Sequence, residues 1–191
     1  LPDYPEPGAS ATVRQLLNHT SGIRSYTNLP SFTENAGATA DSGLTTSELI
    51  AIFDDEPLEF EPGDSWNYNN SGYVLLGAII EAVTGQNWYE AVEERISEPL
   101  GLETLRYGGF EDQMPTMASG YSTDENGDTG PARRIHMSLP HAAGALISDA
   151  EDLAEWAEAL HSGEVISHAL YSEMIAPTML PDGTEVPYGY G

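Results

Sequence analysis

The chain has 191 residues, among them 31 Asp plus Glu and only six cationic residues, all Arg, so its formal net charge at pH 7 is -25. Phosphate groups are bound by clustered cations, and this charge therefore excludes nucleic acid and anionic membrane surfaces as partners. The sequence has no cysteine, which excludes disulfides, thiolate metal sites and a cysteine nucleophile.

The acidic composition also lacks lysine altogether. Self-repulsion destabilises an acidic compact state at low salt, and dissolved salt screens that repulsion. We therefore expect an acidic, halophilic protein. A merely acidic protein from an ordinary environment would explain the charge but would leave the absence of lysine unexplained.

The length fits one domain, residues 1–191, with a core of its own. No apolar run is long enough to span a membrane, and the first residues, LPDYPEPG, do not form a signal peptide. The chain begins in a Pro-rich stretch, and a strand is predicted to start at 188–191, where the sequence stops. Both features are typical of a fragment cut from a longer protein.

The first predicted helix covers residues 13–19, because Thr12 and Gln15 form a capping box. His19 and Ser21 follow it and could be interpreted as a nucleophile and its base. No third partner is in view, and short motifs match by chance often. A structural role for these two residues is the favoured interpretation.

The segment 60–85 organises the rest of the chain. From 73 to 83 only Glu81 is charged, so a helix here is apolar around most of its circumference and must be buried. Gly85 is placed to end this helix in a left-handed conformation. Three residues could cap its start: Asn69, Asn70 and Ser71.

The residues before this helix are predicted to be extended, since Pro62–Gly63 forces a turn and 66–70 then leads into the helix. Side chains on one side of an extended chain repeat every second residue. The phenol of Tyr68 and the carboxamide of Asn70 should therefore share one side, at the mouth of a buried helix. This pair is the candidate for chemistry.

Other helices are predicted from capping residues and apolar periodicity. A long loop at 25–44, rich in small polar residues, separates the first two and is of the kind that borders functional sites. The helix opened by the Asn87–Glu90 box should end at 99–102, where proline and glycine occur together. The predicted helices are 48–55, 88–97 with Trp88, Ala91, Val92 and Ile96 on its apolar face, 149–163, and 168–176.

Ser148 and Glu151 are predicted to cap the helix at 149–163. Just before it, the run 141–147 consists of small apolar residues, in which Gly144 should allow a close approach of another backbone. The inward stripe of this helix is expected to be Leu153, Trp156, Ala157 and Leu160.

Short strands are predicted at 117–122 and 132–137, with a hairpin signal at Asn126–Gly127 between them. Residues 184–191 resemble the first part of another strand. The fold class is therefore mainly α, with a β-hairpin near 117–137 and an incipient strand at the C-terminus.

The acidic loop of this hairpin can also be read as a calcium site, because Asp124, Asn126 and Asp128 alternate like EF-hand ligands. Its glycines are in the wrong places, and Ile135 stands where a bidentate Glu is needed. The hairpin turn is favoured. The five histidines do not occur at metal-ligand spacing, so neither a metal nor another cofactor is assigned.

Four segments resemble the serine beta-lactamase and penicillin-binding-protein superfamily, in particular its branch of class C beta-lactamases, D-alanyl-D-alanine carboxypeptidases and esterases. The Tyr-x-Asn element is weak alone but specific in its Pro-Gly and YNNSGYxLLG surroundings. The resembling segments are TVRQLLNHTSGI (12–23), FEPGDSWNYNNSGYVLLGAIIEAVTG (60–85), EPLGLETL (98–105) and AAGALISDAEDLAEW (142–156).

The resemblance implies a helical subdomain of the beta-lactamase fold and a mechanism in which the serine of a Ser-x-x-Lys motif is acylated. Tyr68 would take the role of the motif tyrosine, and Asn70 that of the amide near the lysine and the substrate carbonyl. A chain without lysine cannot contain Ser-x-x-Lys, and the strand with the family's third motif is also absent. A free tyrosine titrates near about 10 and needs a nearby cation to act as a base. We therefore expect this chain alone to be inactive.

The alternative is a non-catalytic binding or interaction module that keeps the helical scaffold, because fold alone does not determine function. A third hypothesis is that two fragments associate through apolar surface left by truncation. The substrate, a small molecule or peptide, is a lactam, a peptide or an ester, and the sequence does not choose among them. The resemblance favours an extracytoplasmic location.

Overall fold

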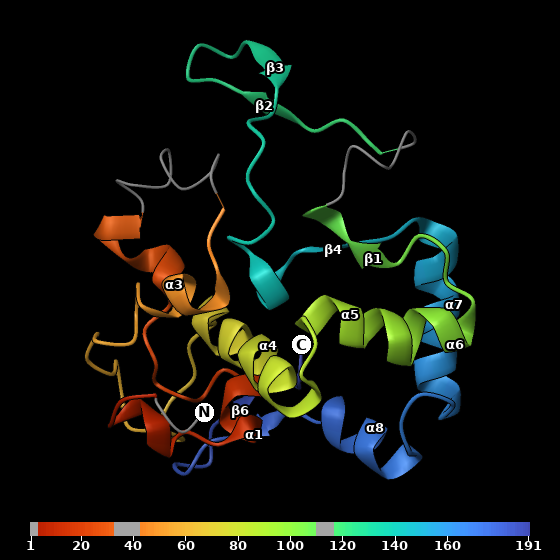
Figure 1. The fold of residues 1–191 in the computed structure, drawn as a ribbon. Helices are drawn as coiled ribbons and strands as arrows, with labels where there is room; N and C mark the ends of the chain where they lie inside the picture. Colours follow the sequence, from red (N-terminus) through yellow and green to blue (C-terminus); the bar gives the residue numbers. More distant parts are fainter. Residues whose placement is uncertain (1–3, 33–42, 110–116) are drawn as a thin grey trace.

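A computed structural model describes residues 4–32, 43–109 and 117–191, and in this part of the chain helix α4 (Asn70–Thr84) lies at the centre (Figure 1). It is capped by Asn69, whose side-chain oxygen accepts the backbone N–H of Gly72 at 3.0 Å. Gly85 ends it with φ 73°. Its predicted existence and caps are confirmed.

A smaller part of α4 is buried than was predicted. Val74 is 0% exposed and Leu75 3%, whereas Val83 near the C-terminal end is 80% exposed. The first turns pack against α1 (Val13–Leu17), α3 (Thr46–Ile50) and the short helical turn η2 (Tyr26–Asn28). The last turn extends past these neighbours, so its apolar side chains reach the surface.

The N-terminal helices start at the predicted capping boxes, which the side chains of Thr12 and Thr45 both form. They end earlier than predicted, and α1 stops at Leu17 because His19 takes a left-handed backbone with φ 62°. A short 3-10 turn, η1 (Gly8–Ser10), precedes α1. The core between these elements and α4 consists of Leu16, Ile23, Tyr26, Leu29, Leu49, Phe53, Val74 and Leu75.

Beyond α4 the chain forms α5 (Trp88–Val92), the π-helical turn η3 (Glu93–Ser97) and α6 (Glu98–Leu100) in continuous succession. The Asn87–Glu90 box is present. The break predicted at 99–102 occurs only at Gly101, whose φ is 70°, because a glycine in the left-handed conformation ends a helix. A second core cluster contains Trp88, Tyr107 and Ala145.

The described strands form three antiparallel pairs of two or three residues each. The predicted hairpin exists as β2 (Tyr121–Thr123) and β3 (Thr129–Pro131), and it projects from the body of the molecule (Figure 1). It is shorter than expected, since β2 has no burial on either face to extend it. The other pairs are β1 (Arg106–Tyr107) with β4 (Leu146–Ile147), and β5 (Thr178–Met179) with β6 (Glu185–Val186).

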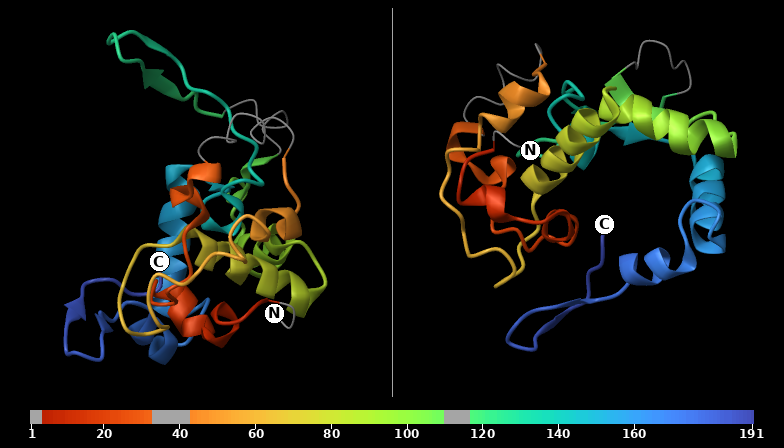
Figure 2. Two further views of the ribbon diagram at one scale, coloured as in Figure 1. Left: turned by 90° about the vertical axis from the view of Figure 1, so that its left-hand side faces the viewer. Right: turned by 60° about the horizontal axis from the view of Figure 1, so that its bottom comes forward.

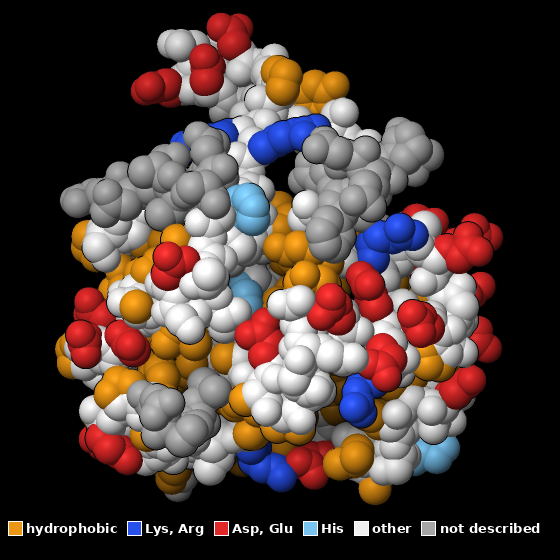
Figure 3. All heavy atoms as spheres, viewed as in Figure 1, with side chains coloured by type: hydrophobic (Ala, Val, Ile, Leu, Met, Phe, Trp, Pro, Cys, Tyr) orange, Lys and Arg blue, Asp and Glu red, His pale blue; other side chains and the backbone are white. Residues whose placement is uncertain are grey.

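The loop of the hairpin bonds to itself. The Asp124 carboxylate accepts the backbone N–H groups of Asn126 and Asp128, both at 2.9 Å. Among the residues that the structure describes, no group of three or more His, Asp and Glu could hold a metal ion. Acidic side chains are spread over the face drawn in Figure 3 rather than gathered at one place.

Helices α7 (Ala150–Ser162) and α8 (His168–Met174) complete the chain's helical part. The cap of α7 is Asp149, not Ser148 as predicted, because the Asp149 carboxylate accepts the N–H groups of Glu151 and Asp152. The predicted inward stripe is also wrong in part, as Leu153 is 55% exposed. Contacts with α6 and α8 leave this side of α7 open.

The described elements follow an arc, and the C-terminal segment returns to α1 (Figure 2). Arg14 and Glu173 form an ion pair at 2.5 Å, and the hydroxyl of Tyr190 donates to Glu173 at 2.8 Å. This contact brings the last residues of the chain beside the segment that follows α1. None of the helices in the described ranges is long and apolar enough to cross a membrane.

Candidate functional site

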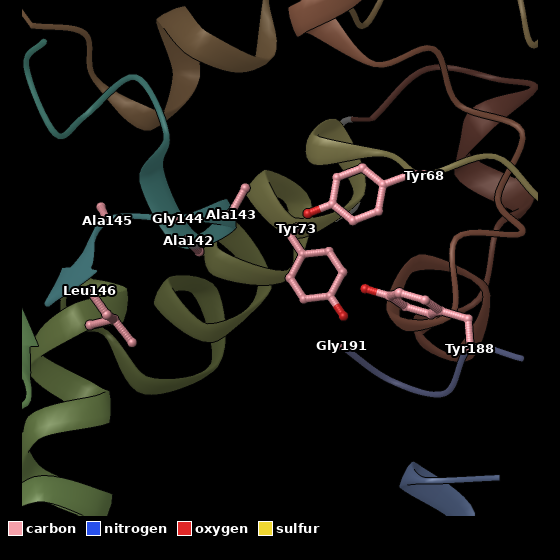
Figure 4. A pocket seen from close by; sticks show the side chains of 9 residues that line it. All are labelled: Tyr68, Tyr73, Ala142, Ala143, Gly144, Ala145, Leu146, Tyr188 and Gly191. Carbon is pink, nitrogen blue, oxygen red and sulfur yellow. The ribbon is translucent and has the colours of Figure 1, made fainter. Parts of the chain in front are cut away.

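Tyr68 stands at the edge of a cavity of about 290 Å³ in front of α4 (Figure 4). Its side chain is 49% exposed, so the phenol is accessible. Aromatic rings line one side of the cavity and small aliphatic residues the other. The lining residues are Tyr68, Tyr73, Ala142, Ala143, Gly144, Ala145, Leu146, Tyr188 and Gly191.

The lead-in to α4 is held by hydrogen bonds to one residue. The backbone N–H of Asn67 donates to the carbonyl of His19, and that of Asn69 donates to the His19 Nδ1, both at 3.1 Å. Alternate N–H groups of an extended chain point to the same side. His19 therefore satisfies the two donors that flank Tyr68.

Asn70 does not line the cavity with Tyr68. Its side-chain amide donates to the hydroxyl of Thr27 at 3.1 Å, and its backbone N–H donates to that of Ser25 at 3.2 Å. Asn70 is the first residue of α4, and the period of two that would align it with Tyr68 ends where the helix begins. It does not cap the helix either, because Asn69 does.

The hydroxyls of Tyr73 and Tyr188 lie close together in Figure 4, whereas that of Tyr68 points away from them, toward the side where Ala142 and Ala143 lie. Tyr73 donates its hydroxyl to the carbonyl of Leu17 at 2.9 Å. Burial, with the nearby Tyr188 and Tyr68, raises the pKa of Tyr73 to about 12. Burial also raises the pKa of Tyr188. Tyr73 and Tyr188 are therefore neutral phenols at neutral pH.

His19 is buried, with 1% of its surface exposed, and burial lowers the pKa of its imidazole. Because Nδ1 accepts the N–H of Asn69, the neutral ring carries its proton on Nε2, which lies 3.2 Å from the hydroxyl of Tyr188. Ser21, also buried, accepts the N–H of Ile23. Each residue thus has a partner of its own, in agreement with the structural interpretation of this pair.

The small-residue wall, residues 142–146, lies against α4. A Cβ atom placed on Gly77 would come within 2.7 Å of the Ala142 side chain, so only glycine permits this approach. The close approach was predicted at Gly144. That residue has an extended φ of 173°, and a Cβ atom placed on it would meet only the Pro140 side chain, at an ordinary contact distance of 3.6 Å.

Tyr68 was predicted from the sequence, whereas Tyr73, Tyr188 and the wall were not predicted as parts of the same cavity. Tyr188 is 169 positions from His19, and no local pattern signals such a contact. Among the described residues, the cavity lining includes no Lys, Arg or Ser. The cavity as described therefore offers phenols and backbone groups, without a nucleophile or a cation.

The described architecture is similar to part of several solved structures. A D-stereospecific amidohydrolase from Streptomyces superimposes with a TM-score of 0.76 at 34% identity, over 94% of this chain and 55% of that one. A penicillin-binding protein from Bacillus halodurans gives a TM-score of 0.77 at 28% identity, over 98% of this chain and 58% of its own.

A penicillin-binding protein of Bacillus subtilis is 29% identical over 206 aligned residues, covering all of this chain and 44% of the relative. The family model named Beta-lactamase matches residues 1–191. The chain therefore belongs to the beta-lactamase family, as its sequence motifs predicted. It spans less than half the length of this curated relative.

Proposed function

We propose that this chain forms part of a serine hydrolase that transfers an acyl group from its substrate to a serine and then to water. The observation that carries the proposal is Tyr68, half-exposed at a cavity in front of α4. Membership of the beta-lactamase family supports it. The serine and lysine of the mechanism would lie in polypeptide outside these 191 residues.

In this proposal Tyr68 handles the proton of the serine, helped by the lysine ammonium. Asn70 contributes its amide to the lysine and the substrate carbonyl, which requires its bond to Thr27 to exchange when the site is complete. The neutral Tyr73 and Tyr188 line the cavity as hydrogen-bonding groups. The 191-residue chain alone would not turn over substrate.

The substrate would be an amide, a lactam or an ester with an acyl carbonyl open to attack. Relatives named for penicillin binding and for D-amino-acid hydrolysis support the first two classes. The sequence motifs do not distinguish an ester from these two classes. The small wall at 142–146 leaves room for a bulky group beside the carbonyl.

The test is Tyr68→Phe in the full-length protein that carries this chain. Hydrolysis of a chromogenic cephalosporin, a D-amino acid anilide and a short nitrophenyl ester is measured for each variant. We expect kcat/KM to fall by about 10² to 10⁴, the range of a lost general acid or base, at unchanged thermal stability. Tyr171→Phe on α8, which also removes one tyrosine hydroxyl, is the matched control.

An unchanged rate in Tyr68→Phe would overturn the assignment of Tyr68. A non-catalytic binding module is the alternative, and it is supported if the complete reading frame contains no Ser-x-x-Lys before this chain and no Lys or His strand motif after it. Serine-dependent turnover by the 191 residues alone would contradict the proposed division of the site.

A further inference from the structure

His19 contacts Tyr68 and the two other tyrosines that line the cavity. Its ring centroid is 4.4 Å from that of Tyr68, 5.2 Å from that of Tyr73 and 5.0 Å from that of Tyr188. The three tyrosines that line the cavity therefore all surround one imidazole. Trp66 packs edge-on against the same ring at 6.1 Å.

Polar contacts fix the ring in this position. The backbone carbonyl of His19 accepts from Asn67, Nδ1 accepts from Asn69, and Nε2 lies beside the hydroxyl of Tyr188. His19 thereby accepts hydrogen bonds from the residues on both sides of Tyr68 in the sequence, and its ring packs against the Tyr68 ring. Among the described residues, no hydrogen bond holds the Tyr68 side chain, and its other ring contact is with Tyr188 at 6.4 Å.

The backbone of His19 is adapted to this position. Its φ of 62° is uncommon for any residue other than glycine, and costs of this kind occur most often at functional sites. Neighbouring residues hold the turn, because the carbonyl of Thr20 accepts from Gly63 at 2.7 Å and that of Gly22 from Glu59 at 2.8 Å. The segment after α1 is thus fastened to the lead-in along its length.

We propose that His19 is a positioning residue that sets the orientation of the Tyr68 phenol through its ring and its Nδ1. It acts through Tyr68 and Asn69, without contact to the reacting atoms. The kinetic consequence rests on the proposed function, whereas the structural consequence does not. The two are therefore tested separately.

The structural test follows the Tyr68 ring by NMR in full-length protein with ¹³C-labelled tyrosine, where Tyr68→Phe assigns the signal. His19→Gly removes the side chain and tolerates the left-handed backbone. His19→Asn also tolerates it and keeps an oxygen acceptor for the Asn69 N–H. His161→Asn is the control, because His161 pairs with Tyr171 at 3.0 Å on other helices.

We expect the Tyr68 signal to shift and broaden in His19→Gly, to move less in His19→Asn, and to stay in place in His161→Asn. A Tyr68 signal in His19→Gly that matches the wild type overturns the proposal, whatever the activity. If His19→Gly does not fold, the same comparison is made with His19→Asn, which removes the ring and keeps an acceptor for the Asn69 N–H; the Tyr68 signal must then shift in that variant, and an unmoved signal overturns the proposal.

The kinetic test compares the same variants. Misplacement of a reacting group by about 1 Å can reduce the rate about a hundredfold, so we expect kcat in His19→Gly to fall about ten- to a hundredfold with KM nearly unchanged. His19→Asn should recover part of this loss. Loss of kcat in Tyr68→Phe without loss in folded His19→Gly contradicts the positioning role. No turnover in wild type, with the Tyr68 signal still dependent on His19, refutes the proposed function alone.

Discussion

Two histidines with left-handed backbones border the cavity. His19, with φ 62°, contacts Tyr68, and His141, with φ 47°, directly precedes the small-residue wall. Both are almost completely buried, at 1% and 5% exposed. A left-handed conformation at a non-glycine residue costs free energy and is retained where the surroundings enforce it. At both positions the strained residue fixes a part of the cavity lining.

His141 is held neutral by its surroundings. The hydroxyl of Thr46 donates to Glu81 at 2.9 Å and lies 3.2 Å from the His141 Nε2, so this nitrogen carries the ring proton and donates to the hydroxyl oxygen. Nδ1 is buried without a hydrogen-bond partner among the described residues. Protonation would place a second N–H there, with nothing to accept it.

We predict that His141 makes the fold sensitive to acid. Burial lowers the pKa of His141 to about 4 from its ordinary 6.5, so the unfolded chain binds the proton more readily. The contribution of the neutral His141 to the free energy of unfolding is complete above pH 6.5 and is lost as the pH falls toward 4. At about 1.4 kcal/mol per pKa unit, the loss is at most about 3 kcal/mol, and Glu81 at 4.0 Å reduces it.

The measurement is urea unfolding of wild type and His141→Asn at pH 7 and pH 4.5. Asn tolerates the left-handed backbone and does not titrate. The wild type should lose more unfolding free energy on acidification than the variant does. Equal losses in the two proteins would show that another group sets the acid response.

The packing of α4 against the wall is the contact between elements on which the cavity depends. Gly77 meets Ala142 and His141 so closely that a methyl group does not fit without movement. The wall continues into β4, which pairs with β1. A displacement at Gly77 would therefore pass directly to the residues that line the cavity.

Gly77→Ala should destabilise the protein, because overpacking costs about 1–3 kcal/mol and the gain in helix propensity returns only about 1 kcal/mol. Thermal unfolding measures the difference. Gly130→Ala in β3 is the control, since a Cβ atom there would meet nothing within 4 Å. Stability equal to or above wild type in Gly77→Ala would contradict the described packing.

Local signals in the sequence predicted most of the helices. The capping boxes at Thr12, Thr45 and Asn87 and the left-handed Gly85 were confirmed because caps are made by residues three or four positions apart. The cap of α7 was misplaced by one residue, since Ser148 and Asp149 are both competent. Element ends and the exposure of Leu153 depend on neighbouring helices, which a local pattern does not contain.

The cavity was predictable only at Tyr68. Of its two other phenols, Tyr188 reaches the site through a contact across most of the chain, beside the Arg14–Glu173 pair. Asn70, which was predicted to share a side with Tyr68, is the first residue of α4 and is not among the residues that line the cavity. The part of the loop at 33–42 that was expected to border the site lies outside the described residues.

On the scale of the whole molecule, charge is the dominant property. A net charge of -25 repels itself in the compact state, and salt shortens the range of this repulsion from about 10 Å at 0.1 M to about 3 Å at 1 M. The Arg14–Glu173 pair is screened as well, but exposed ion pairs contribute little to stability. We therefore expect salt to weaken the repulsion among the acidic side chains more than it weakens the attraction within this ion pair.

We predict that the midpoint of thermal unfolding rises steadily as NaCl increases from 0.05 to 2 M, about the range over which screening changes most. Differential scanning calorimetry measures it, and Arg14→Gln, which removes the attractive pair, should show at least as steep a rise. A midpoint that stays constant or falls with salt would contradict the interpretation of the protein as salt-adapted.

The proposed function depends on Tyr68 being part of an acyl-transfer centre. Intact mass spectrometry of the full-length protein, quenched at short times after mixing with a slowly released beta-lactam or an active ester, measures formation of the acyl adduct directly. We predict an adduct on the wild type within the first turnovers and a strongly delayed one on Tyr68→Phe. Adducts that form at equal rates on both proteins would contradict the central claim.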